Sequence, residues 1–226
     1  MEFFNKRNKP PENKPKENWR IREWFSDISD DEDSKLKFFN SELIKYNSVL
    51  SLVSEKTLPL ADAIHFSDCI MGCREIVKDA QPKSIVDIGS GNGFPSLVMA
   101  ILFPSIKVIV LERDTRKSEF LKSVSSQIGL KNFEVQLASS DGSGMVSCDL
   151  VMMRAFIPIS KAILALRKQV KKGGHLYMFK SEEWATEVAN IPSQLCSFWT
   201  PSLVSEYRLP IGEVKFAVIK LKKIAD

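Results

Sequence analysis

The sequence predicts an α/β fold: a mostly parallel seven-stranded sheet with an antiparallel hairpin at one edge, preceded by a small helical cap. Three observations lead to this prediction. From residue 84 onward, short runs rich in β-branched residues alternate with helical stretches, which is typical of a parallel sheet covered by helices. A tight turn joins the last two candidate strands. Before residue 80 the apolar residues recur at helical spacing instead.

The N-terminal third divides into an arm and a cap. Lysines and prolines dominate the first 20 residues and an acidic cluster follows, so we predict a disordered basic and acidic arm over 1–33. The arm is either a phosphate-seeking tail or a dispensable terminus. The acidic cluster also suits the start of a helix, because Leu36, Phe39 and Leu43 then recur at helical spacing. A second helical segment over 58–78 completes a predicted cap of residues 34–80.

Residues 81–226 are predicted to form one Rossmann-like domain. Its helices are expected near 95–103, 115–129 and 158–171. The connection at 209–212 is short, so the last two strands should pair antiparallel. A parallel sheet that ends in such a hairpin is typical of class I methyltransferases. The predicted strands are 85–88, 107–111, 133–137, 149–153, 176–179, and about 198–207 and 213–221.

Composition sets broad limits on function. The sequence has no apolar run of about 18 residues and no apolar signal segment, so we expect a cytoplasmic protein without a membrane span. Its four cysteines and two histidines lack the spacing of a zinc site, and we expect no metal. A net charge of +4 permits an anionic partner without requiring one. Lysines that either contact RNA or simply face solvent are Lys122, Lys131, Lys168, Lys171 and Lys172.

A glycine-rich segment follows the first predicted strand. The strand ends in Asp87, and Gly89, Gly91 and Gly93 then permit a sharp turn and the close approach of a ligand at the carboxyl end of the strand. Dinucleotide-binding loops need a third glycine where this chain has Phe94. We therefore interpret these five residues as an S-adenosylmethionine loop.

Two further acidic positions fit the same cofactor. Glu112 ends the second predicted strand and can accept hydrogen bonds from two ribose hydroxyls, or it caps the next helix instead. Asp141 and Ser140 follow the third strand and are placed to meet the adenine edge. Both residue types are also common in plain turns.

Several segments resemble the RsmG family, also called glucose-inhibited division protein B. Residues 86–95 are similar to its D-x-G-[ST]-G-x-G-[FL]-P loop, and shorter matches at 65–69, 116–121, 154–156, 179–180 and 212–220 follow the family's order. The resemblance covers about residues 36–223. It implies methylation of N7 of a guanine in the 530 loop of 16S rRNA. It also implies cofactor-binding roles for Gly89, Phe94, Ser140, Asp141 and Arg154.

The sequence departs from the family pattern at four positions. Ile64 and Ser139 stand where the family has arginine, Ser181 replaces a glycine, and Lys215 replaces the hairpin arginine. Lysine lacks the bidentate geometry of arginine at a phosphate contact. All four departures lie outside the glycine-rich loop.

The expected chemistry needs positioning more than acid–base catalysis, because N7 has a free lone pair and no proton to lose. No catalytic residue is assigned. Arg154, Lys180 and Lys215 are candidates for orienting RNA phosphates or the guanine O6 edge. We expect a monomer that acts on 16S rRNA, the small subunit or its precursor. Two alternatives stay open: a methyltransferase of this fold for a small molecule or protein, and a non-catalytic ribosome-assembly factor.

Overall fold

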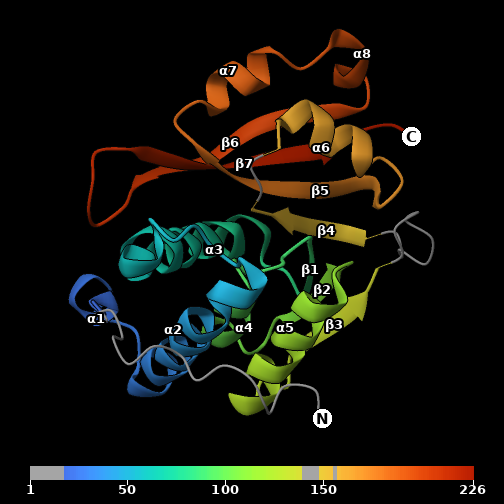
Figure 1. Ribbon diagram of the computed structural model, residues 1–226. Coiled ribbons are helices and arrows are strands. Elements are labelled where there is room, and N and C mark those ends of the chain that lie inside the picture. The colour runs from blue at the N-terminus through green and yellow to red at the C-terminus, as the bar shows by residue number, and fades with distance from the viewer. Residues whose placement is uncertain (1–17, 139–147, 155–156) are drawn as a thin grey trace.

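The computed structural model describes residues 18–138, 148–154 and 157–226, and it confirms the predicted sheet (Figure 1). The strand order is β3-β2-β1-β4-β5-β7-β6, parallel from β3 to β5 and antiparallel at β7 and β6. The order reverses beside β1, which is where parallel sheets bind ligands. The strands are β1 (Ser84–Ile88), β2 (Lys107–Glu112), β3 (Phe133–Leu137), β4 (Cys148–Met153), β5 (Val170–Ser181), β6 (Trp199–Arg208) and β7 (Lys215–Lys223).

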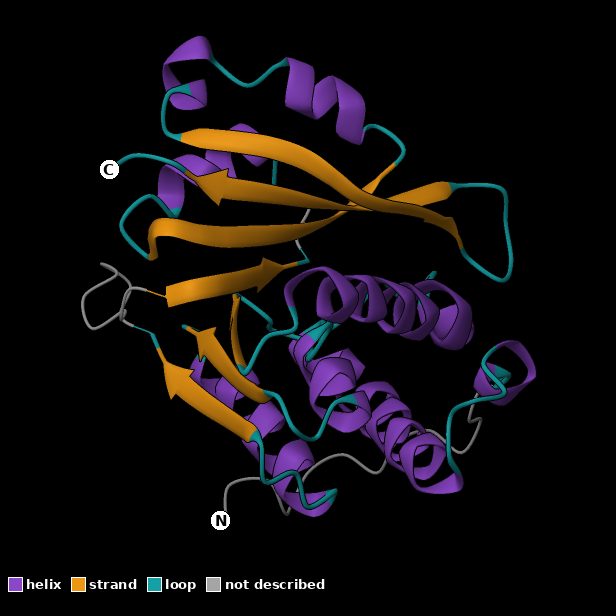
Figure 2. Ribbon diagram, turned by 180° about the vertical axis from the view of Figure 1, so that it is seen from behind, coloured by secondary structure: helices purple, strands orange, loops and turns teal. Residues whose placement is uncertain are grey.

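Helices cover both faces of the sheet (Figure 2). Side chains alternate along β4, so Met152 joins the apolar cluster beneath α2 to α5, whereas Val151 and Met153 join the cluster beneath α6. None of the helices in the described ranges is long and apolar enough to cross a membrane. The α-helices after the first are α2 (Asp30–Leu50), α3 (Ser67–Ala80), α4 (Ser96–Leu102), α5 (Thr115–Gln127), α6 (Ile159–Ala165), α7 (Trp184–Ala189) and α8 (Ser193–Cys196).

Two predicted helices differ in extent from the observed ones. The segment predicted as one helix over 58–78 contains a 3₁₀ turn (Leu58–Leu60), a π-helical turn (Asp62–Phe66) and then α3. The helix predicted over 158–171 ends at Ala165, because β5 already begins at Val170 and pairs there with Cys148. Helical periodicity alone did not reveal these interruptions.

The predicted disordered arm is wrong for residues 18–33, while residues 1–17 lie outside the described part of the chain. Ser29 caps α2 in a reciprocal capping box with Glu32. Ile21, in α1 (Ile21–Trp24), is fully buried, and Arg20 forms an ion pair with Asp62 at 2.8 Å. A few well-spaced apolar residues anchor this segment, although its average composition is polar.

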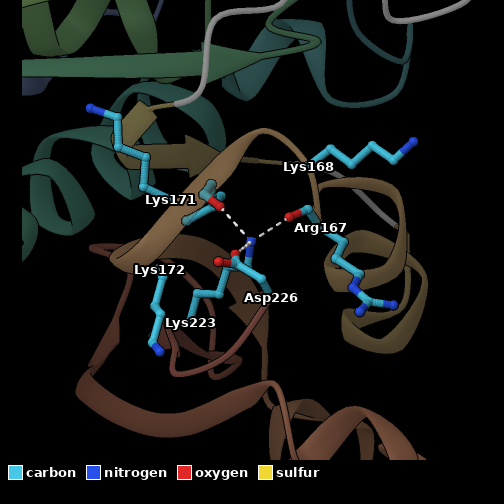
Figure 3. A pocket seen from close by; sticks show the side chains of 7 residues that line it. Arg167, Lys168, Lys171, Lys172, Lys223 and Asp226 are labelled. Atoms are coloured by element: carbon cyan, nitrogen blue, oxygen red, sulfur yellow. Dashed lines mark hydrogen bonds and ion pairs between the residues drawn. The ribbon is translucent and has the colours of Figure 1, made fainter.

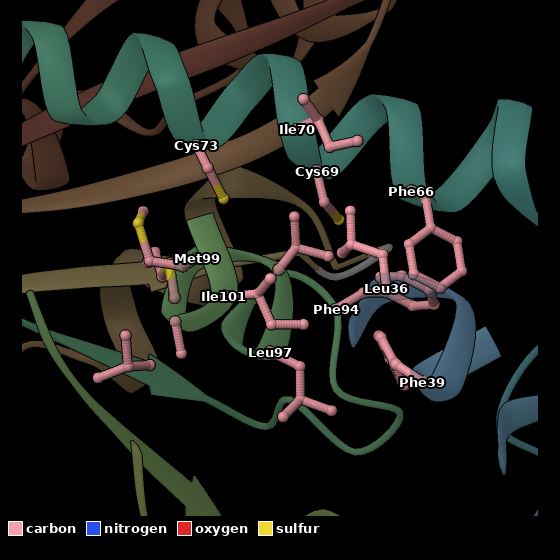
Figure 4. Packing of buried hydrophobic residues seen from close by; sticks show 14 of the residues in the cluster. Leu36, Phe39, Phe66, Cys69, Ile70, Cys73, Phe94, Leu97, Met99 and Ile101 are labelled. Atoms are coloured by element: carbon pink, nitrogen blue, oxygen red, sulfur yellow. The ribbon is translucent and has the colours of Figure 1, made fainter. Parts of the chain in front are cut away.

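Phe66 joins the N-terminal segment, α2 and the glycine-rich loop (Figure 4). Its ring is fully buried and makes edge-on contacts with Trp19, Phe39 and Phe94 at centroid distances of 5.0, 5.2 and 4.9 Å. Such aromatic contacts stabilise a core beyond the area they bury. The cap and the sheet domain therefore share one apolar core.

Replacing Phe66 with alanine should destabilise the whole protein, because it leaves a cavity where these elements meet. We expect the free energy of unfolding, measured by urea denaturation, to fall by about 3–5 kcal/mol. Val49→Ala is a matched control on α2, since Val49 is 54% exposed, and it should change stability by less than about 0.5 kcal/mol. Similar values for the two variants would contradict the shared core.

Candidate cofactor site

The glycine-rich loop leads from β1 into α4 with its three glycines in the left-handed region, where side chains are disfavoured. Their φ angles are 75° at Gly89, 49° at Gly91 and 90° at Gly93. A Cβ on Gly93 would lie 2.6 Å from a methyl of Leu97, so a side chain does not fit there. A Cβ on Gly89 would meet no described atom within 4 Å. The first glycine therefore leaves open space beside the main chain.

Asp87 lies beneath this loop as a buried carboxylate that has no hydrogen bond of good geometry to the described residues, although Ser90 and Ser96 lie close to it. It is 1% exposed. Burial raises its pKa to about 7; the nearby Ser90 and Ser96 hydroxyls, which bond each other at 2.5 Å, partly oppose this rise, and the charge of Glu112 adds to it. An uncompensated buried acid is costly. The position therefore suits a ligand that brings a hydrogen-bond donor or a positive charge.

Glu112 fixes the loop from the end of β2. One carboxylate oxygen accepts a hydrogen bond from the Gly91 amide at 2.8 Å, and the other accepts from the amides of Arg113 and Asp114 at 2.7 and 2.9 Å. A carboxylate has about four acceptor positions, so Glu112 retains capacity for a hydroxyl. Glu112 does not cap the next helix, because Asp114 occupies the N-cap position of α5 and its side chain accepts hydrogen bonds from the first amides of that helix.

Arg154 follows β4 and joins it to the cap and to the final hairpin. Its Nε donates to Asp68 at 2.6 Å, and Tyr207 on β6 donates to the other oxygen of the same carboxylate at 2.8 Å. The guanidinium is also held over the ring of Phe94, 5.8 Å from its centroid. Burial opposes the charge, but the carboxylate of Asp68 outweighs it and raises the pKa of Arg154. Arg154 is thus held internally beside the loop.

His65 fastens the cap to the loop as a neutral ring. It stacks on Phe94 at a centroid distance of 5.5 Å. Its Nδ1 lies 3.3 Å from the Arg154 guanidinium, which can only donate, so Nε2 carries the proton and donates to Thr57 at 2.9 Å. Burial first, and the charge of Arg154 second, lower the pKa of His65 to about 3. Phe94 is itself 1% exposed, and its amide donates to the Asn92 side chain at 3.0 Å, so its role is to pack beneath the loop.

The other predicted site residues are placed differently. Lys180 is 6% exposed, and its ammonium donates to the Ile157 carbonyl at 2.6 Å and to Glu187 on α7 at 2.7 Å. This internal ion pair corrects the expectation of a free cation there. Lys215 is exposed at the start of β7, at the same sheet edge as the glycine-rich loop. Ser139, Ser140 and Asp141 lie outside the described residues.

Three residues near the site were not assigned from the sequence. Asp68 and Lys117 stand in segments that resemble family motifs, but nothing marked their roles. The Lys117 stem packs over the loop, 3.5 Å from where a Gly91 Cβ would lie. Tyr207 gave no signal, since its contact with α3 joins residues 139 positions apart. No group of three or more His, Cys, Asp or Glu side chains in the described ranges is arranged to hold a metal ion.

The strand order, the glycine-rich turn after β1 and the acid at the end of β2 together define a class I S-adenosylmethionine-dependent methyltransferase. Solved structures agree with this fold. The MtNAS protein, solved in complex with MTA and tNA, aligns with a TM-score of 0.55 over 91% of this chain and 75% of its own, at 13% identity. The YcgJ protein of Bacillus subtilis aligns with a TM-score of 0.52 over 69% of this chain and 99% of its own, at 13% identity. At these identities the likeness concerns the fold alone.

Sequence comparison identifies the family. The family model described as GidB, rRNA small subunit methyltransferase G, matches residues 32–200, so the chain belongs to this family of S-adenosylmethionine-dependent enzymes. It is 48% identical to ribosomal RNA small subunit methyltransferase G 3 of Bdellovibrio bacteriovorus, over 92% of this chain and 94% of the relative. It is 33% identical to ribosomal RNA small subunit methyltransferase G of Borrelia hermsii, over 70% of this chain and 77% of the relative.

Asp87→Asn should remove a pH-dependent instability of the cofactor-free protein. The folded pKa of about 7 lies above the ordinary value of 3.8, so the wild type is most stable while Asp87 is protonated and loses stability as pH rises from about 4 to 7. Across that window the free energy of unfolding of the variant should rise by about 2–4 kcal/mol relative to that of the wild type. Above pH 7 the difference between the two proteins should stay constant. Urea denaturation at pH 4, 5.5, 7 and 8 measures this difference, and a difference that is constant from pH 4 to 8 would contradict it.

Glu112→Gln should weaken cofactor binding, because it removes the charge that accepts from the Gly91 amide and that we predict to accept from a ribose hydroxyl. We expect the dissociation constant, measured by titration calorimetry, to rise by the equivalent of about 1–3 kcal/mol. Glu119→Gln makes the same chemical change on the exposed face of α5 and should leave affinity unchanged. Equal affinities for both variants would remove Glu112 from the site.

Proposed function

We propose that this chain transfers a methyl group from S-adenosylmethionine to N7 of a guanine in the 530 loop of 16S rRNA. Membership of the rRNA small subunit methyltransferase G family, over residues 32–200, is the observation that carries the proposal. The relative in Bdellovibrio bacteriovorus supports it, because the similarity extends over 94% of that protein and is not limited to one short motif.

The proposed cofactor site uses residues from the ends of β1 and β2. The open side of Gly89 permits close approach to the main chain, and the unpartnered carboxylate of Asp87 suits the positively charged part of the ligand. Glu112 has acceptor capacity for the ribose. When bound, S-adenosylmethionine supplies a methyl group that is already activated on a sulfonium. Ser140 and Asp141 stay proposed partners of the adenine.

The chain's own residues then serve to position the acceptor. N7 of guanine needs no base, and His65 is unsuited to be one, since both ring nitrogens are already bonded and its pKa is low. We propose that Arg154 acts as a positioning residue that holds the loop and cap in one arrangement. Of the lysines proposed to orient RNA, Lys215 keeps an exposed ammonium at the carboxyl edge, and Lys180 supports α7 instead.

The acceptor atom can be tested by chemical substitution in the RNA. A small-subunit rRNA fragment carrying 7-deazaguanosine at the target position lacks the attacking nitrogen, so we expect methyl transfer to fall to background. The matched control carries 7-deazaguanosine at a neighbouring guanine and should be methylated normally. Transfer of labelled methyl groups, followed by nuclease digestion and mass spectrometry, gives the readout. Undiminished transfer to the substituted RNA would exclude N7 as the acceptor.

The same assay separates this proposal from the open alternatives. A protein that binds S-adenosylmethionine but methylates neither naked nor protein-bound small-subunit rRNA would point to another acceptor. A protein that fails to bind the cofactor at high concentration would instead match a non-catalytic assembly factor.

A further inference from the structure

A hollow of about 360 Å³ lies between the end of α6, the start of β5 and the end of β7 (Figure 3). Five of its seven lining residues are basic and one is acidic, so its formal charge equals the net charge of +4 of the whole chain. Elsewhere the charges balance. The lining residues are Arg167, Lys168, Val170, Lys171, Lys172, Lys223 and Asp226.

The fold holds the central cation of this hollow in place. Lys223 is 4% exposed, and its ammonium donates to the main-chain carbonyls of Arg167 and Val170 at 2.7 and 2.9 Å. Its third contact is the exposed carboxylate of Asp226 at 2.7 Å. The hydrogen bond and charge of Lys223, with smaller contributions from Lys172 and Arg167, lower the pKa of Asp226. The carboxylate marks a position where an anion is stabilised.

The cations at the rim of the hollow make exposed contacts or no ion pair with the described residues. Lys171 forms an exposed ion pair with Asp149 at 3.0 Å, and Arg167 lies over the ring of Phe198 at 4.1 Å. Lys168 and Lys172 are exposed and form no ion pair with any residue that the structure describes. Their side chains extend outward in different directions (Figure 3). This arrangement suits several anionic groups in a row better than one small anion.

The polarity of the lining residues argues against a small-molecule site. Such pockets are mostly apolar with a few polar groups, whereas Val170 is the one apolar residue among the seven that line this hollow. A chain of phosphates fits better, because each lysine or arginine that meets a phosphate releases a counterion.

The hollow lies at the edge of the sheet opposite the cofactor site. Cys148 pairs with Val170 at one end of β4, and Arg154 follows the other end. Five residue steps of about 3.3 Å separate these ends, roughly 17 Å. A ligand that reaches both places must therefore be extended, as a polynucleotide is.

We propose that this hollow binds the sugar–phosphate backbone of the rRNA substrate away from the methylated base, and that an RNA phosphate replaces the Asp226 carboxylate on Lys223. The inference rests on the proposed function in that RNA is the partner. It assigns Lys168 and Lys172 to flanking phosphates.

The test measures affinity for a transcript of the 16S rRNA region that contains the 530 loop, at several salt concentrations. Lys168→Ala/Lys172→Ala should weaken binding about 25-fold at 0.1 M salt, about 5-fold per lost contact, and should reduce the salt slope by about 1.4. Asp226→Asn should tighten binding by about 5-fold, because it removes the competing carboxylate. Cofactor affinity should stay unchanged in both proteins, and the melting temperature should stay unchanged in the lysine variant.

Matched controls separate a local site from net charge. Lys78→Ala/Lys83→Ala removes two exposed lysines at the same sheet edge, near the end of α3 and before β1, and Glu119→Gln makes the same charge change as Asp226→Asn. Because charges farther apart than about 10 Å are screened at this salt, each control should change affinity by less than about 2-fold.

Each remaining outcome has a definite meaning. If the wild type methylates the transcript but the variants bind it like their controls, the hollow is not an RNA site and the proposed function stands. If the lysine variant instead loses binding to anionic phospholipid vesicles and keeps RNA affinity, this inference is overturned in favour of a lipid surface. A wild type that neither binds nor methylates the transcript overturns the proposed function and this inference together.

Discussion

The buried ion pair between Arg154 and Asp68 is the contact on which the arrangement of the site depends. It joins the end of β4 to α3 across 86 positions of sequence, at an Nε–Oδ2 distance of 2.6 Å. Tyr207 adds β6 to the same carboxylate, and the guanidinium contacts His65 and Phe94 on its other sides. Removing one partner of such a pair leaves an uncompensated charge, which costs about 3–5 kcal/mol. The pair therefore fixes one relative position of cap, loop and hairpin.

This constraint changes the meaning of the N-terminal cap. The sequence divides into a helical part before residue 80 and a sheet after it, as separate domains would. In the structure one apolar cluster contains Leu36 and Phe66 from the cap together with Leu97 from α4. Phe94, the residue whose presence disfavours a dinucleotide loop, joins the two parts. Its ring lies between cap and sheet and contacts Phe39 and Phe66. Loop and cap form a single unit.

Local patterns were enough to predict the sheet. Strand positions agree with β-branched runs to within one or two residues, except at β5, and the hairpin follows from one short turn. The apolar run that predicted β5 begins at Leu176, but the strand begins at the buried Val170, and the exposed Lys171, Lys172 and Gly173 separate the two. The sequence analysis did not predict that residues 18–33 are ordered, because a single buried apolar residue such as Ile21 does not alter the average composition of a segment.

The site was predictable where it depends on sequence-local chemistry. Glycines with left-handed φ and an acid at a strand end are visible as short motifs, and Gly91 and Glu112 do come together. Partners of buried charges are not visible in this way. Lys180 looked like a free cation because Glu187, which neutralises it, lies on α7, a six-residue helix that the sequence did not predict. Whether a charge is available to a substrate is decided by tertiary contacts.

The same reasoning explains why net charge is a weak guide to an RNA-binding protein. The formal charge of +4 is small for this length, and outside the hollow the numbers of basic and acidic residues are equal. What matters for a polyanion is an uncancelled excess in one place, since exposed charges act over little more than a Debye length. An enzyme that only positions a nucleophile gains rate by holding its substrate at separated points. In this fold the proposed cofactor site lies at the carboxyl edge of the sheet, which leaves the opposite edge for the backbone contacts that we propose.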